Sequence, residues 1–191
     1  MIFKHFLNDS IEEDLVRAKK VCDQIHEEFE NSINPDSCVY IVDPYLDPVR
    51  DIYYPFSKNE TDDNIWSYFL SYLIEDLKNG KIMILTSFDL TQLGKLIPGK
   101  LSYPFDIKHS LGSCQVLISK ILKGRGVKSP DELHDRLILL EGTKQLGFHI
   151  GPSLTNLERK DCTITKFESK KIKDSINRIK DIWEMSLKIR V

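Results

Sequence analysis

The stretch Leu133–Asp161 limits most strongly what this chain can fold into. It contains an apolar run, Leu137–Leu140, with the length and composition of a buried strand, and Glu141-Gly142 ends that run in a turn. A second apolar run, Leu146–Ile150, follows and leads into a loop of small residues. The pattern predicts a β-hairpin that forms part of a larger sheet.

Four side chains suited to a phosphate diester fall at one end of this predicted hairpin: His134, Arg136, Ser153 and Asn156. An imidazole can act as nucleophile or acid, a guanidinium supplies a fixed cation, and a hydroxyl and an amide can hold the other oxygens. His134 and Arg136 are two residues apart, which puts both on one face of an extended strand. We therefore predict that these four residues share a pocket.

His134 also has two other interpretations. A histidine at the start of a buried strand is often only a hydrogen-bonded edge residue, and residue type alone favours that interpretation. A metal site built from His134, Asp135 and His149 is disfavoured, because Asp135 would point to the sheet face opposite His134. His149 lies on the strand before the loop, where it can be either packed or solvated.

The pattern H-x-R-x-x-x-x-E followed by G-x-S-x-x-N resembles one half-motif of the phospholipase D-like superfamily. The usual pattern there is H-x-K-x-x-x-x-D followed by G-S-x-N, so Arg136 stands at the lysine and Glu141 at the aspartate, and the spacing from Gly151 to Asn156 is longer. These departures resemble a variant branch with HDR and HIG-x-SL sequences. That branch occurs in prokaryotic defence-type effectors, and a similar variant occurs in lipid-binding modules attached to microtubule-interacting-and-trafficking domains.

The resemblance implies one mixed α/β domain over residues 1–191, with a sheet flanked by helices and a single copy of the half-motif. It also implies a metal-independent phosphodiesterase reaction through a phosphohistidine, with no cofactor. Because two half-motifs are needed, a second chain would supply the second histidine, which implies a homodimer. Four further residues are expected to bind phosphate or line the pocket: Glu141, Lys160, Asp43 and Tyr45.

The remaining elements follow from short apolar runs that alternate with amphipathic segments. Further strands are expected at Val39–Val42, Ile82–Thr86, Tyr103–Lys108 and Thr163–Phe167, and helices at Asp62/Asp63–Leu77, Phe88–Pro98 and Ser169–Arg190. Asp51–Asp63 is expected to be irregular. Leu111–Lys123 fits either a strand or a helix, and its length favours a helix. Thr86 and Ser87 are expected at the same sheet edge as Asp43, which is otherwise a common turn residue before proline.

An amphipathic helix is predicted over residues 10–32, with one narrow apolar stripe: Ile11, Leu15, Ala18, Cys22, Ile25 and Phe29. Such a stripe can pack against the chain's own sheet. Its steps of four and three residues also fit a seam between two chains, as in a coiled coil.

Composition sets the outer bounds on function. The chain of 191 residues is 41% hydrophobic and 29% charged, which is ordinary for one globular domain. No apolar run approaches the ~20 residues of a membrane span, and the N-terminus lacks the apolar core of a signal peptide, so a cytoplasmic location is expected. The scattered cysteines Cys22, Cys38, Cys114 and Cys162 form no zinc motif and are expected to be reduced.

A formal net charge of −2 gives no global indication of nucleic-acid binding. The first third of the chain is rich in acidic residues and the last third in basic residues, which either creates a local basic face or reflects two solvated helices. The basic loop Lys123–Lys128 fits solvent exposure better than a phosphate-binding loop. Two functions remain open: a nuclease-type phosphodiesterase, and a non-catalytic module that binds nucleic-acid backbone, anionic lipid or protein.

Overall fold

The structure is a computed structural model, and it describes residues 2–4, 11–58, 60–61, 64–88, 90–96, 105–106, 114–120, 136–151, 163–167 and 169–187. Within these residues eight strands form one mixed sheet in the order β1-β8-β7-β6-β2-β3-β5-β4. The strands are β1 (Ile2–Lys4), β2 (Cys38–Val42), β3 (Lys81–Thr86), β4 (Phe105–Asp106), β5 (Gln115–Lys120), β6 (Arg136–Glu141), β7 (Gln145–Ile150) and β8 (Thr163–Lys166). The predicted α/β class with a mixed sheet is confirmed.

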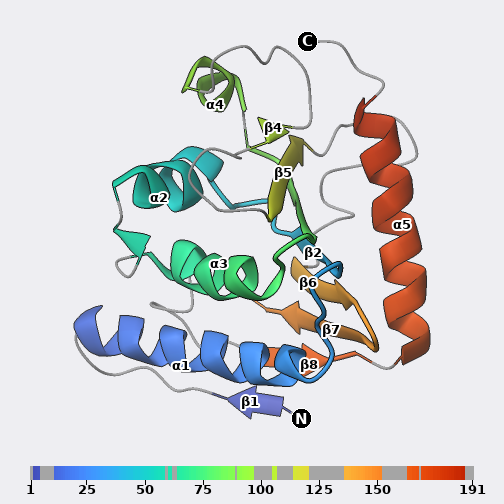
Figure 1. Ribbon diagram of the computed structural model, residues 1–191. Helices are drawn as coiled ribbons and strands as arrows, with labels where there is room; N and C mark the ends of the chain where they lie inside the picture. The colour runs from blue at the N-terminus through green and yellow to red at the C-terminus, as the bar shows by residue number, and fades with distance from the viewer. Residues whose placement is uncertain are drawn as a thin grey trace.

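Helices cover both faces of the sheet, but unequally (Figure 1). One face carries α1 (Ile11–Glu30), α3 (Ile65–Asp76) and the shorter η1 (Val49–Tyr53), α2 (Tyr54–Lys58) and α4 (Thr91–Leu96). The other face carries α5 (Ser169–Leu187), drawn in red, which buries Ile172, Ile176 and Trp183 against the sheet. We call these the α1/α3 face and the α5 face.

The middle of the sheet is the β2–α3–β3 unit, whose two strands are parallel as predicted. β6 lies antiparallel on the other side of β2 and continues into the predicted hairpin with β7. Because β2 has strands on both sides and helices on both faces, Val39 and Ile41 are fully buried, and this explains its continuous apolar run.

The apolar stripe of α1 packs on the chain's own sheet. Ala18, Cys22, Ile25 and Phe29 are all at most 2% exposed and belong to the core on the α1/α3 face. The Phe29 and Phe148 rings lie 5.6 Å apart between centroids, which ties the helix to β7. Of the two interpretations of the stripe, the intramolecular one therefore holds, and these side chains are not available as a seam between chains.

Three local expectations were wrong. The helix favoured for Leu111–Lys123 is instead strand β5 where the structure describes it, because residues 115–120 pair along their whole length with β3. The segment expected to be irregular forms η1 and α2, and the buried carboxylate of Asp51 there is satisfied by Arg50 and by the Asp47 N–H. The helix expected to begin at Asp62 or Asp63 is α3, which begins at Ile65. Its N-cap is Asn64, whose side chain accepts hydrogen bonds from two backbone N–H groups.

The turn between β6 and β7 packs tightly against the segment that follows α1. The backbone N–H and the hydroxyl of Thr143 both donate to the Ser32 carbonyl, at 3.0 and 2.9 Å. A Cβ atom placed on Gly142 would lie 2.3 Å from that same carbonyl oxygen. Only glycine fits there without a backbone shift, so this turn fixes the register of the hairpin.

Gly142→Ala is therefore expected to destabilise the protein by about 1–3 kcal/mol, because backbone must move to admit the methyl group. Urea unfolding of the variant and wild type measures this difference. Lys144→Ala, at an exposed position of the same turn, serves as the control and should stay within about 0.5 kcal/mol of wild type. Equal stabilities of Gly142→Ala and wild type would contradict the close approach.

A search for membrane-spanning segments within the described residues found no helix with the necessary length and hydropathy.

Candidate functional site

Arg136 lies at one edge of the sheet, in a row of residues that the strand register brings together. It pairs with Ile150 on β7. The register of β2 with β6 (Val42 opposite Leu137) places Asp43 beside it, and the Asp43 N–H continues the ladder to the Leu85 carbonyl at 3.0 Å. This row lies at the carboxyl ends of β2 and β3, where α/β sheets commonly bind ligands.

The guanidinium of Arg136 is held by three groups. Its Nη1 donates to the Gly151 carbonyl, its Nε lies 3.9 Å from Asp43 Oδ1, and its central carbon lies 4.7 Å from the centre of the Tyr45 ring. The Arg136 side chain is 17% exposed and that of Asp43 only 1%. Among the described residues, the buried Nε has no hydrogen-bond partner. The guanidinium is thus fixed in position by contacts with three different groups, and about a sixth of the side chain remains exposed.

The loop after β2 is built around the Asp43 carboxylate. The Tyr45 N–H donates to Asp43 Oδ1 at 2.9 Å, and the Leu46 N–H donates to the Asp43 carbonyl at 3.3 Å. The buried hydroxyl of Thr86 then donates to the Leu46 carbonyl at 2.7 Å, which ties this loop to the end of β3. These bonds hold the backbone of Tyr45 in place beside Arg136, although the residue is 47% exposed.

The structure thus brings three of the predicted site residues together: Arg136, Asp43 and Tyr45. The other predicted residues of this pocket, His134, Ser153, Asn156 and Lys160, lie outside the described residues. The carbonyl of Gly151 is a contact that the sequence analysis missed, because a backbone acceptor carries no residue-type signal.

Glu141 does not join this cluster. It lies at the other end of β6, about 17 Å along the strand from Arg136, and on the α5 face. Its carboxylate accepts hydrogen bonds from the Tyr40 hydroxyl at 2.8 Å and the Lys180 ammonium at 2.7 Å. Partial burial alone would raise the pKa of Glu141, but the hydrogen bonds from Lys180 and Tyr40 outweigh it, and the pKa is lowered. Glu141 therefore attaches α5 to the sheet and is not a pocket residue.

This ion pair predicts a pH-dependent contribution to stability. Because the pKa of Glu141 is lower in the folded chain than in the unfolded chain, the contribution is present above the unfolded value and is lost as the pH falls through the folded value. Lys180→Met should cost about 0.5 kcal/mol near neutral pH, since the Lys180 side chain is 42% exposed, and the cost should shrink in acid. Urea unfolding near pH 7 and near pH 3 measures it.

Lys173→Met on the same helix is the control for this comparison, since Lys173 is exposed. A Lys180→Met cost that stays constant from neutral to acid pH would show that Glu141 is not the partner whose titration matters.

His149 lies on the α5 face, where its ring centre is 6.3 Å from that of Phe167. Arg136 lies two and four residues before Ile138 and Leu140 on β6, and these two residues pack on the α1/α3 face. Because side chains alternate along a strand, Arg136 belongs to that face and His149 to the opposite one. Within the described part of the chain, no cluster of three or more His, Cys, Asp or Glu side chains is arranged to hold a metal ion.

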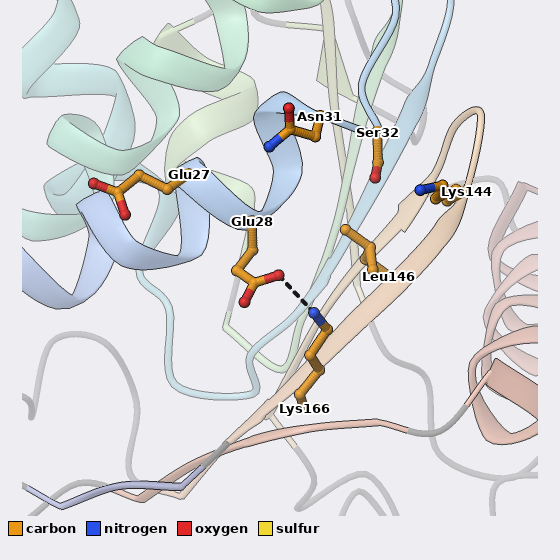
Figure 2. Close-up of a pocket in the computed structure, with 7 residues that line it drawn as sticks. All are labelled: Glu27, Glu28, Asn31, Ser32, Lys144, Leu146 and Lys166. Carbon is orange, nitrogen blue, oxygen red and sulfur yellow. Dashed lines mark hydrogen bonds and ion pairs between the residues drawn. The ribbon is translucent and has the colours of Figure 1, made fainter.

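A cleft of about 530 Å³ lies away from Arg136, between the end of α1 and strands β7 and β8 (Figure 2). Its lining residues are Glu27, Glu28, Asn31, Ser32, Lys144, Leu146 and Lys166. The Glu28 carboxylate and the Lys166 ammonium point toward each other across it and pair at 2.5 Å. Ser32 and Lys144 place the cleft at the turn end of the hairpin, opposite the Arg136 end, so it is separate from the predicted phosphate site.

The Arg136 cluster places a fixed guanidinium beside an exposed aromatic residue, at the carboxyl ends of β2 and β3 where α/β sheets commonly bind ligands. The chain was also compared with protein-family models, with curated proteins and with solved structures, and none of the three comparisons found a match.

Proposed function

We propose that this chain is a phosphodiesterase of the phospholipase D-like type, a nuclease that cleaves without a metal ion and acts through a phosphohistidine on His134. The proposal rests on the sequence pattern from His134 to Asn156 and on one structural observation, the hydrogen bond from Arg136 Nη1 to the Gly151 carbonyl. That bond joins the first and second parts of the pattern at one edge of the sheet.

Covalent geometry extends this observation to the other predicted site residues. His134 precedes Arg136 by two residues, and Ser153 follows Gly151 by two. Consecutive Cα atoms are about 3.8 Å apart, so covalent geometry alone limits the Cα–Cα distance to about 8 Å, both from His134 to Arg136 and from Ser153 to Gly151. In this proposal His134 supplies the nucleophile and Ser153 a hydroxyl beside one fixed cation, and together these groups can carry out phosphoryl transfer without a metal ion.

In the proposed reaction, an imidazole nitrogen of His134 attacks phosphorus and forms the N–P bond. The P–O bond to the leaving group breaks, and a second histidine donates a proton to the departing oxygen. Water then attacks phosphorus, gives a proton to that second histidine, and the N–P bond breaks. Arg136 offsets the charge of the non-bridging oxygens, and Ser153 and Asn156 donate hydrogen bonds to them.

The second histidine comes, in this proposal, from a second copy of the chain. One imidazole cannot attack phosphorus and also protonate the oxygen that leaves on the opposite side. A two-fold axis beside the site supplies both groups from one sequence. The stripe on α1 is used inside the chain, so the proposed contact is formed by the Arg136 edge itself.

One observation favours a second function, a module that binds phosphate groups without turnover. Arg136 is paired with the buried Asp43 and bonded to Gly151, so part of its charge is already offset. An arginine held in this way can dock nucleic-acid backbone or an anionic lipid headgroup as a fixed recognition group.

Hydrolysis of an end-labelled oligonucleotide in excess EDTA distinguishes the two functions. The proposed nuclease cleaves at the same rate with and without the chelator, and light scattering shows a dimer. Affinity for phosphorylated ligands without cleavage, from a monomeric chain, would instead establish the binding module.

A further inference from the structure

We propose that Tyr45 and Phe88 form a stacking surface beside Arg136, and that the substrate of this site is single-stranded nucleic acid. This inference rests on the proposed function and specifies its substrate: Arg136 holds a backbone phosphate while an adjacent unpaired base lies against the aromatic rings.

The first observation is the exposure of these rings. In the described part of the chain four large hydrophobic residues are exposed: Val16, Tyr45, Tyr54 and Phe88. Tyr45 is 47% and Phe88 37% exposed; Tyr45 lies three residues after the end of β2, and Phe88 two residues after the end of β3. Singly exposed hydrophobic residues are common on protein surfaces, but these two aromatic residues both lie at the carboxyl ends of parallel strands, where α/β sheets commonly bind ligands.

The second observation is that hydrogen bonds join the two loops. The Ser87 N–H donates to the Pro44 carbonyl at 3.3 Å, and the Thr86 hydroxyl donates to the Leu46 carbonyl at 2.7 Å. The Phe88 N–H in turn donates to the Thr86 hydroxyl at 3.2 Å. Both neighbours of Tyr45 in sequence are therefore bonded to the segment that carries Phe88, which keeps the two aromatic residues on adjoining loops.

The third observation is the stacking of Arg136 on Tyr45. The guanidinium carbon lies 4.7 Å from the ring centre, and Tyr45 is still 47% exposed, so part of this residue remains free to contact a base. A base against the exposed part of Tyr45 would bring an adjacent backbone phosphate toward the guanidinium. Such stacking contributes about 1–3 kcal/mol per base and tolerates any sequence, because every base has a π-face.

The surface favours an unpaired strand over a duplex or a membrane. In a duplex the base faces are already stacked on one another, so a flat ring has nothing to contact. An anionic membrane is drawn by uncompensated basic residues, but here Arg136 is paired with Asp43 and Arg50 with Asp51. The same pairing means that stacking rather than charge supplies most of the affinity, which predicts a shallow dependence on salt.

Fluorescence anisotropy of labelled oligonucleotides tests the inference, with all proteins in a His134→Ala background so that no strand is cut. An oligo-dT and an oligo-rU probe separate DNA from RNA, and a hairpin duplex tests strandedness. Tyr45→Leu and Phe88→Leu should each weaken binding of the preferred single strand about tenfold. The slope of log affinity against log salt should lie near −1, as for one or two phosphates.

Tyr54→Leu is the matched control, because Tyr54 is 45% exposed but lies on α2 rather than on the two loops. It should leave the affinity unchanged. Equal binding of the duplex, equal effects of all three substitutions, or binding to phosphatidylserine vesicles but not to oligonucleotides would each overturn the inference.

Hydrolysis of bis(p-nitrophenyl) phosphate in EDTA by the wild-type chain separates this inference from the proposed function. That small diester needs the phosphate site but no stacking on a strand. Its hydrolysis without oligonucleotide binding would overturn only the stacking surface. Tyr45-dependent binding of single strands without hydrolysis of either substrate would overturn only the phosphodiesterase.

Discussion

Replacing His134 with alanine is expected to lower EDTA-resistant phosphodiester hydrolysis at least about a thousandfold. The proposed reaction needs a nitrogen atom to form the bond to phosphorus, and neither water nor a neighbouring side chain replaces a lost nucleophile at a comparable rate. The measurement is the initial rate of cleavage of an end-labelled oligonucleotide by equal amounts of folded wild type and variant.

His149→Ala is the matched control, because His149 lies on the α5 face beside Phe167, and it should retain the wild-type rate. A site that two chains share predicts a second result. Mixing His134→Ala chains with wild type should depress the rate beyond simple dilution, because mixed dimers carry one histidine instead of two. Full activity from a demonstrably monomeric sample would contradict the dimeric site.

Arg136→Ala is expected to destabilise the chain by about 3 kcal/mol, the largest effect on stability among the substitutions considered. Asp43 is 1% exposed, and loss of the guanidinium removes a positive charge from beside its buried carboxylate. The Tyr45 N–H continues to bind Asp43 Oδ1, which keeps the cost at the low end for a broken buried ion pair. Urea unfolding at neutral pH measures the change.

Lys166→Ala provides the contrast. The ion pair of Lys166 with Glu28 is short, at 2.5 Å, yet the two side chains are 32% and 35% exposed. The expected loss of stability is therefore below about 1 kcal/mol. In an Asp43→Asn background the cost of Arg136→Ala should shrink markedly, because no charge is left beside the guanidinium. Equal costs in both backgrounds would show that Asp43 is not the group that Arg136 stabilises.

The sequence was most informative where burial dictates composition. The apolar runs that became β2, β3, β6 and β7 are buried on both faces or packed under a helix, and such strands need uninterrupted apolar side chains. The stripe on α1 had the correct period, but periodicity alone did not say whether its partner was this chain or another. Only the packing of Cys22 and Phe29 into the core decided that.

The predictions from the sequence that were wrong have one physical cause in common: contacts with distant parts of the chain determined the outcome. Gln115–Lys120 has an apolar run that suits either a strand or a buried helix, and pairing with β3 determined the outcome. Glu141 was assigned to the pocket from its place in a sequence pattern. It lies five residues after Arg136 on β6, however, and this odd spacing puts the two side chains on opposite faces of the sheet and at opposite ends of the strand. The meeting of Arg136 with Asp43 and Tyr45 was anticipated because all three fall at strand ends.

The most direct test of the central claim is to trap the covalent intermediate. Wild-type chain is mixed with an oligonucleotide in EDTA, quenched within the first turnover under alkaline denaturing conditions that preserve phosphohistidine, and analysed by peptide mass spectrometry. We expect a phosphoryl-linked adduct on the peptide that contains His134, absent from His134→Ala and lost on acid treatment. Hydrolysis that requires a divalent metal and leaves no adduct on His134 would contradict the account.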